Sequence, residues 1–305
     1  MSQCVSLVII NPAAAMGKTA QRSEAITEGL TKTLGSGFRI LRTNGPGDAE
    51  SLAREAVRDG MELIIAVGGD GTIQEIVNGM LTAGKSGAHT CGLGIITSGT
   101  GNGFAQSLGL PGDLEGQLAM LRSSHIRAVD VAWLELCSHK GRFVINETQI
   151  GIGGEVVRRV RGKLKMLGGK IAFGVGTVAS AVRFPNRHLT VVTDAMSFGG
   201  AYTGITISNG EFTGGGMNLT PGAAMDDGAL DVLVMHAMGV FERLWNFPKI
   251  YSANHLRSAH FSLMRTGTIS VASDEVVPVA ADGELLGFAP CSVRVVPHAL
   301  KIRMN

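Results

Sequence analysis

Strand-like and helical patterns alternate along the first 130 residues of the chain. Four short apolar runs have the length and composition of buried strands, at residues 5–10, 38–41, 63–67 and 93–96. Between the second and third runs, residues 48–59 carry apolar side chains at helical spacing, and Asp48 is the expected N-cap. This alternation favours right-handed strand–helix–strand units and an α/β domain whose mainly parallel sheet is covered on both faces.

The pattern changes after Asp130. Short β-rich runs separated by glycine turns follow at residues 143–145, 189–193, 203–207, 229–235 and 268–272. One helical insertion is expected, at residues 241–255. We therefore predict an N-terminal α/β domain over residues 1–130 and a mainly antiparallel, β-rich C-terminal domain over residues 131–296. The last strand, at residues 297–305, can return to the first domain.

The composition argues against several classes of protein. The chain has 305 residues, 45% of them hydrophobic, which is enough for a full core, so intrinsic disorder is not expected. Lys and Arg number 27 against 25 Asp and Glu, and only 2 Trp and 2 Tyr accompany 11 Phe, so no nucleic-acid partner is expected. The four cysteines form no CxxC pair, and the first residues do not resemble a secretory signal, which favours a reducing cytoplasm.

The longest uncharged stretch of small and apolar residues covers residues 171–182. As a helix this stretch would reach only about 18 Å, whereas the hydrocarbon core of a bilayer is roughly 30 Å thick. We therefore expect a protein that can touch a membrane surface without crossing it.

Two glycine-rich loops follow the third and fourth predicted strands, where parallel sheets bind their ligands. They read GGDGT at residues 68–72 and SGTGNG at residues 98–103. Glycine lets the backbone approach a ligand closely, and the N–H groups at a helix start suit phosphate. Asp70 can order a metal ion or water, while Thr100 and Asn102 offer hydroxyl and amide groups. A plain turn explains either loop alone, but two adjacent loops favour a phosphate site.

The loop after the first strand is similar to a P-loop. Residues 12–19 read PAAAMGKT, against the pattern GxxxxGK[ST]. Pro12 replaces the first glycine, and proline has no N–H and cannot take positive φ, so the phosphate nest would be broken. We therefore reject a true P-loop. Asn11 and Pro12 can still line a nucleotide pocket, and Lys18 can reach a phosphate.

Two acidic segments in the second half of the chain are candidates for chemistry. Residues 226–231 contain three aspartates among turns, which can hold a hard cation or form a polar hairpin turn. Further on, Asp282 and Glu284 flank Gly283. On a strand, this spacing would place both acids on one face, whereas a turn at Gly283 would aim them apart.

A basic segment lies between these regions. Residues 156–170 contain no acid and carry six basic side chains, namely Arg158, Arg159, Arg161, Lys163, Lys165 and Lys170. Beside an anionic bilayer each charge is worth at most about 1 kcal/mol, so the segment can dock on a membrane, and a solvated face is the equal alternative. The eight histidines show no ligand spacing, so no zinc site is expected.

Taken together, these loops resemble the diacylglycerol kinase catalytic-domain family, in particular the bacterial soluble lipid kinases. Sphingosine kinases, NAD kinases and phosphofructokinases are more distant relatives. The matching pieces span nearly the whole chain, at residues 11–12, 43, 47–49, 68–72, 99–102, 130, 150–153, 209–232 and 282–284. GGDGT is shared with NAD kinases, whereas the run GGGM…P…DDGxLDV within residues 209–232 is much more specific to the lipid kinases.

The resemblance implies a kinase that uses ATP and Mg²⁺ to phosphorylate the hydroxyl of a lipid alcohol such as diacylglycerol, in a cleft between its two domains. It implies that Asp70 organises Mg²⁺ and the phosphates, that Thr43 and Thr100 contact ATP, and that Asp130 supports the metal. The remaining nucleotide contacts would come from Asn11, Pro12, Gly68, Gly69, Gly71, Thr72 and Asn102.

In the second domain, the resemblance implies that Asp227 and nearby main-chain carbonyls hold a structural cation. It also implies that Glu284, assisted by Asp282, is the base for the lipid hydroxyl. The chain departs from the family at Gly103, where many members have Asp in the pattern GTxND. This substitution removes one carboxylate near the phosphates and bears on the metal arrangement or the nucleotide preference.

Two other functions remain open from the sequence. An NAD kinase would also carry GGDGT, and Asn146-Glu147 is similar to a pair in that family. A catalytically inactive lipid-binding module would explain Gly103, although Asp70, Asp282 and Glu284 are retained. A Rossmann dehydrogenase is not supported because no strand is followed by GxGxxG. The expected partners are a lipid alcohol and, transiently, an anionic membrane surface, with a cytoplasmic location and a homodimer compatible with the sequence.

Overall fold

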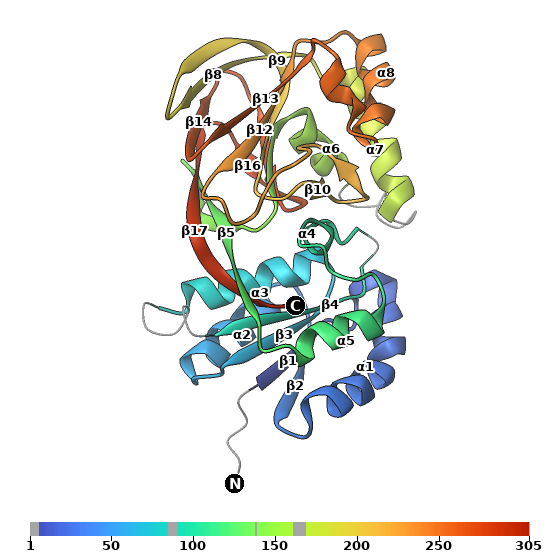
Figure 1. Cartoon of the computed structure of the whole chain (residues 1–305). Coiled ribbons are helices and arrows are strands. Elements are labelled where there is room, and N and C mark those ends of the chain that lie inside the picture. Colours follow the sequence, from blue (N-terminus) through green and yellow to red (C-terminus); the bar gives the residue numbers. More distant parts are fainter. Residues whose placement is uncertain (1–5, 85–90, 100, 138, 161–168, 305) are drawn as a thin grey trace. The chain divides into compact units, whose positions relative to one another are not determined.

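The computed structural model describes residues 6–84, 91–99, 101–137, 139–160 and 169–304. The chain forms two compact units (Figure 1). Unit 1 comprises Met1–Asp130 and His298–Asn305, and unit 2 comprises Val131–Pro297. Two strands, β5 (Ile126–Leu136) and β17 (Cys291–Arg303), contribute residues to both units.

Unit 1 is an α/β domain around a parallel sheet. The sheet contains β1 (Ser6–Ile10), β2 (Phe38–Arg42), β3 (Leu63–Gly68) and β4 (Gly92–Thr97), in the order β4-β3-β1-β2. Ile302 of β17 adds a parallel partner beside Leu93. Strands β1, β3 and β4 are buried along their whole length, which explains their continuous apolar sequences. The predicted parallel sheet is confirmed.

The helices of unit 1 cover this sheet. They are α1 (Lys18–Leu34), α2 (Asp48–Arg58), α3 (Asp70–Thr82), α4 (Gly103–Ser107) and α5 (Leu114–Arg122), with a short 3-10 helix η1 (Ala14–Gly17). The predicted helix after β2 is present as α2, but the prediction that Asp48 is its N-cap is wrong. Gly47 occupies the cap with a φ of 84°, and the Asp48 carboxylate instead accepts the N–H of Asn44 at 2.7 Å.

Unit 2 is β-rich, and its described strand pairs are antiparallel. Besides parts of β5 and β17, it contains β6 (His139–Val144), β7 (Glu147–Gly151), β8 (Arg187–Thr193), β9 (Ser197–Ser208), β10 (Phe212–Thr213), β11 (Met217–Asn218), β12 (Leu230–His236), β13 (Phe261–Thr266), β14 (Thr268–Ala272), β15 (Pro278–Ala281) and β16 (Glu284–Phe288). Alternate side chains from these strands build one buried apolar cluster. The predicted antiparallel, β-rich domain is confirmed.

The helices of unit 2 differ from the sequence prediction. The single expected insertion at residues 241–255 consists of α8 (Val240–Ile250) and a 3-10 helix η3 (Asn254–Arg257). Two further helices, α6 (Ile152–Val160) and α7 (Gly169–Arg183), were not predicted. In α7, exposed apolar side chains replace the usual polar outer face, so the sequence lacks the expected amphipathic pattern. Within the part of the chain that the structure describes, no helix is long and apolar enough to span a membrane.

Helices α2 and α3 pack closely at Gly79. A Cβ atom on Gly79 would overlap the carbonyl oxygen of Glu50 and would lie 2.9 Å from the Cβ of Ala53. By contrast, a Cβ on Gly71, in the first turn of the same helix, would meet open space. The packing of α2 on α3 therefore requires glycine at position 79 but not at position 71.

We predict that Gly79→Ala lowers the free energy of unfolding by about 1–3 kcal/mol, because the added methyl group forces the helices apart. Gly71→Ala is the matched control and should cause no loss. Urea unfolding followed by circular dichroism measures both. Equal stability of the two variants would contradict the close packing at Gly79.

Candidate functional site

The glycine-rich loops after β3 and β4 contact each other in unit 1. A Cβ built on Gly99 would lie 2.7 Å from Oδ1 of Asn102 and 3.1 Å from the Cα of Gly69, so there is little room for a side chain at position 99. The N–H of Ser98 also donates to the carbonyl oxygen of Gly68 at 2.9 Å. The two loops that the sequence singled out therefore form one continuous surface at the carboxyl end of the sheet.

The carboxylate of Asp70 connects these loops. It accepts the N–H groups of Gly103 at 3.2 Å and Phe104 at 3.3 Å. Burial raises the pKa of Asp70, and the bonds from these backbone N–H groups oppose the rise. Gly103 therefore meets Asp70 through its main chain, at the position where many family members carry a second carboxylate.

Asn11 connects the loop after β1 to the same surface. Its Nδ2 donates to the hydroxyl of Thr72 at 2.9 Å, and its Oδ1 accepts the N–H of Ala13 at 3.0 Å. Pro12 follows directly and is half-buried. After β2, the N–H of Thr43 donates to the carbonyl oxygen of Ile10 at 2.9 Å, and the residue is buried. Polar residues from three strand ends thus lie at one edge of the sheet.

Two further predicted nucleotide contacts come from the loop after β4. Asn102 has a left-handed backbone, with a φ of 48°, and its side-chain oxygen is buried without a hydrogen-bond partner among the described residues. An unpaired buried oxygen of this kind can accept a hydrogen bond from a ligand. Thr100 lies outside the described residues.

The metal ligands suggested by the resemblance lie in different surroundings. Asp130 is fully buried, and its carboxylate accepts the N–H of His298 at 2.7 Å. Among residues 6–84, 91–99, 101–137, 139–160 and 169–304, no three His, Cys, Asp or Glu side chains gather as a metal site. Mg²⁺ bound with a nucleotide needs only one or two carboxylates because phosphates and water supply its other ligands. Asp70 fits that requirement, and the metal roles of Asp130 and Asp227 stay predictions.

Asp227 faces a protein cation in unit 2. Its carboxylate forms an ion pair with the guanidinium of Arg265 and accepts the N–H of Ala229 at 3.1 Å. Asp231 lies 3.7 Å from the same guanidinium. Burial raises the pKa of Asp231, Arg265 lowers it, and the neighbouring Asp227 raises it further. The acidic turn is therefore neutralised in part by an arginine side chain.

The sequence DGE forms a turn between β15 and β16. Asp282 and Gly283 have φ values of 46° and 78°, as a two-residue hairpin turn requires. Of the two alternatives considered for this motif, the turn is correct. Glu284 begins β16, is half-exposed, and its carboxylate lies 3.5 Å from Nη2 of Arg142.

Asp282 itself is bound to the main chain. Its carboxylate accepts the N–H groups of Ile145 and Asn146, both at 2.9 Å, and of Glu147 at 3.2 Å. Its own N–H donates to the carbonyl oxygen of Glu147 at 3.0 Å. Asp282 therefore fixes the chain before β7 to the turn that presents Glu284. Its role as an assistant to Glu284 stays a prediction.

We predict that Asp282→Ala lowers the free energy of unfolding by about 2 kcal/mol or more, because three N–H groups lose a charged acceptor. Glu284→Ala should cost less than about 1 kcal/mol, since an exposed ion pair contributes little. Thermal unfolding of both variants provides the comparison. A loss for Glu284→Ala as large as that for Asp282→Ala would contradict this division of roles.

The structure also shows a buried polar network that the sequence analysis noted only as a likeness to NAD kinases. Glu147 is buried and accepts hydrogen bonds from the Thr213 hydroxyl and the Asn146 amide. Asn146 Nδ2 also donates to the carbonyl oxygen of Phe212 at 2.7 Å. These bonds connect Asn146 and the start of β7 to β10. The sequence signal was an Asn-Glu pair directly after an apolar run.

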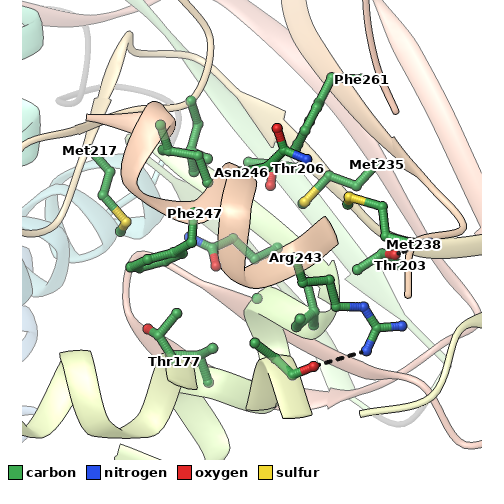
Figure 2. A pocket seen from close by; sticks show the side chains of 17 residues that line it. Thr177, Thr203, Thr206, Met217, Met235, Met238, Arg243, Asn246, Phe247 and Phe261 are labelled. Carbon is green, nitrogen blue, oxygen red and sulfur yellow. Dashed lines mark hydrogen bonds between the residues drawn. The ribbon is translucent and has the colours of Figure 1, made fainter. Parts of the chain in front are cut away.

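An apolar pocket in unit 2 was not predicted. Its cavity has a volume of about 80 Å³ and opens to solvent. Its walls come from β7, β9, β11, β12, β13, α6, α7 and α8, and Figure 2 shows Met217, Met235, Met238, Phe247 and Phe261 around it. A few polar side chains also line the pocket, among them Gln149, Thr206 and Asn246. An apolar cavity with few polar groups is typical of a small-molecule site.

The basic segment is described only in part. Arg158 and Arg159 both form ion pairs with Glu155, at 2.6 and 2.7 Å. Residues 161–168 lie outside the described part, including Arg161, Lys163 and Lys165. Membrane docking by this segment therefore stays a prediction.

Two family models match the chain. The diacylglycerol kinase catalytic domain matches residues 6–134, and the YegS C-terminal NAD kinase beta sandwich-like domain matches residues 147–304. A probable lipid kinase YegS-like from Enterobacter sp. (strain 638) is 28% identical over 302 residues, covering 98% of this chain and 95% of that protein. Diacylglycerol kinase from Bacillus subtilis (strain 168) is 26% identical over 249 residues, covering 81% and 79%.

A solved structure has the same fold. The crystal structure of a putative diacylglycerol kinase from Bacillus anthracis str. Sterne superposes with a TM-score of 0.81 at 24% identity. The match covers 100% of this chain and 98% of that chain.

Proposed function

Because the chain belongs to the bacterial lipid kinase family of YegS-like proteins and diacylglycerol kinases, we propose that it transfers the γ-phosphate of ATP to a lipid alcohol. Diacylglycerol is the acceptor that the resemblance favours. The apolar pocket of unit 2 is the observation that supports a lipid as the acceptor. Burying an acyl chain there would gain about 0.8 kcal/mol for each methylene group.

The nucleotide half of the proposal depends on the loops of unit 1. Glycines at positions 69 and 99 leave the backbone open where the loops meet, and the start of α3 favours a negatively charged phosphate. Asn102 and Asn11 would supply amide groups beside it. Bound Mg²⁺, held by the phosphates and Asp70, would neutralise charge on the transferred group.

Residues of unit 2 would prepare the acceptor. Glu284 is half-exposed, so its carboxylate is accessible to the hydroxyl group of a lipid acceptor. A positioned base of this kind contributes typically about 10²–10⁴-fold to the rate. Asp282 holds the turn in place through its three backbone hydrogen bonds, and Gln149 and Thr206 offer polar groups within the pocket.

Labelled ATP tests this function directly. The protein is given labelled ATP and Mg²⁺ with a panel of acceptors tested one at a time: diacylglycerol, phosphatidylglycerol, a sphingoid base, ceramide and NAD. We predict that the labelled γ-phosphate appears in a lipid product. Asp70→Ala and Glu284→Ala should each reduce the label by about 100-fold or more, since they remove the carboxylates for metal and base. Unfolding temperature serves as the control for correct folding of each variant.

Label in NAD but in no lipid would replace the proposal with an NAD kinase. Absence of label in every acceptor would support the inactive lipid-binding module. Full activity in either variant would remove that residue from the mechanism.

A further inference from the structure

Helix α8 exposes several large apolar side chains on its outer face. Phe241 is 89% exposed and Trp245 is 74% exposed, and Leu244 and Tyr251 are also exposed. The opposite face buries apolar Ile250 together with the polar side chains of Arg243 and Asn246. A helix that covers the core of a water-soluble domain normally presents polar side chains to solvent, so the outer face of α8 is suited to an apolar environment.

Helix α7 also exposes apolar side chains on its outer face. Val175, Val178 and Val182 are each about half-exposed, at 50%, 52% and 48%, and their spacing places them on one face. Thr177 and Ser180 are buried on the other face, and the Ser180 hydroxyl has no hydrogen-bond partner within the described chain. Helices α7 and α8 thus both bury some polar groups on their inner faces and expose apolar groups on their outer faces.

The two helices are joined by Arg243. Its guanidinium donates to the carbonyl oxygens of Ala181, at 3.3 Å, and Phe184, at the end of α7. It also donates to the side-chain oxygen of Asn186 at 2.6 Å. A cation at a helix C-terminus satisfies carbonyl groups that have no partner within the helix. Helices α7 and α8, neighbours in Figure 1, are therefore held as one pair.

The charges around these faces are mainly positive. The ammonium group of Lys249 lies 5.3 Å from the ring centre of Trp245, and Arg183 is exposed at the end of α7. Helix α7 contains no acid, and the acid on α8 is Glu242, whose carboxylate accepts the N–H of Gly239 and lies 3.1 Å from His260. Aromatic rings beside basic groups favour the headgroup layer of a membrane.

We propose that the outer faces of α7 and α8 form a docking surface that inserts into the headgroup layer of an anionic lipid bilayer. We define this docking surface by Val175, Val178, Val182, Phe241 and Trp245. The identity of the occupant rests on the proposed function, because a lipid kinase meets its acceptor at a bilayer. Insertion of this kind is interfacial, as for amphipathic helices with Trp and Phe on the apolar face.

The docking surface lies on the outer side of two helices that line the apolar pocket. The inner faces of the same two helices line the pocket, through Thr177 and Ala181 of α7 and through Asn246 and Phe247 of α8. Docking by these helices would therefore bring a wall of the pocket to the membrane. This surface differs from the basic segment at residues 156–170, in which both described arginines are paired with Glu155.

Vesicle binding tests the docking surface without any turnover. The double variant Phe241→Ser and Trp245→Ser is compared with wild type by sedimentation with vesicles of phosphatidylglycerol and phosphatidylcholine, in the absence of nucleotide. Because both rings would no longer be buried in the bilayer, we expect the variant to bind about tenfold more weakly or worse, a loss of at least about 1.4 kcal/mol. The separate variant Val178→Ser should weaken binding to a smaller extent.

The matched controls are Met196→Ser and Val276→Ser, which remove apolar side chains that are 55% and 68% exposed elsewhere in unit 2. They should bind vesicles within about twofold of wild type, since they leave the two helices unchanged. Equal loss in the controls and the double variant would overturn the docking surface. So would unchanged vesicle binding of the double variant with a fall in its sedimentation mass, because the face would then join two copies of the chain.

A second assay separates this inference from the proposed function. Dioctanoylglycerol dispersed in detergent presents the lipid hydroxyl without a bilayer. If wild type binds vesicles through α7 and α8 but labels no lipid in detergent, the docking surface stands and the kinase proposal fails. If wild type labels dispersed lipid while the double variant binds vesicles as wild type does, the kinase proposal stands and the docking surface fails.

Discussion

The proposed nucleotide site of unit 1 depends on the close approach of two backbone segments. Gly69 and Gly99 meet where β3 and β4 end, and the Asp70 carboxylate holds this arrangement by accepting N–H groups from Gly103 and Phe104. A side chain at Gly99 would crowd Gly69 and Asn102, and loss of the carboxylate would release the start of α4. A phosphate site built in this way uses the main chain and one acid, which suits phosphoryl transfer because that reaction needs alignment and charge neutralisation.

In unit 2, helices α7 and α8 line the apolar pocket on one side and expose apolar side chains on the other. This arrangement buries polar side chains of α7 and α8, which is unfavourable unless they are hydrogen-bonded. Arg243 offsets part of this desolvation energy by donating to carbonyl oxygens at the end of α7. A protein that worked entirely in water would gain from exposing those groups and burying Trp245 and Phe241. The exposed apolar faces of α7 and α8 are the reason that we propose docking at a lipid surface, and the chain belongs to a lipid kinase family.

Much of the fold could be predicted because its signals are local. The strands at residues 6–10, 63–68 and 92–97 are buried on both faces, so each appears in the sequence as a continuous apolar run. The glycine loops and the turn at Asp282 likewise depend on neighbouring residues. The pocket could not be predicted, because Gln149, Met235 and Phe247 are far apart in sequence and meet only through the packing of sheet and helices. Helix α7 was missed because its apolar stripe faces outward.

The central claim is that unit 2 holds the acyl chain of the lipid acceptor within its apolar pocket. Photocrosslinking with a diacylglycerol that carries a diazirine near the end of one acyl chain tests this claim most directly. The account predicts adducts, located by mass spectrometry, on pocket residues such as Met235 and Phe247, and their loss when excess unlabelled diacylglycerol is added. Adducts confined to unit 1, or adducts in unit 2 that avoid the pocket and resist competition, would contradict it.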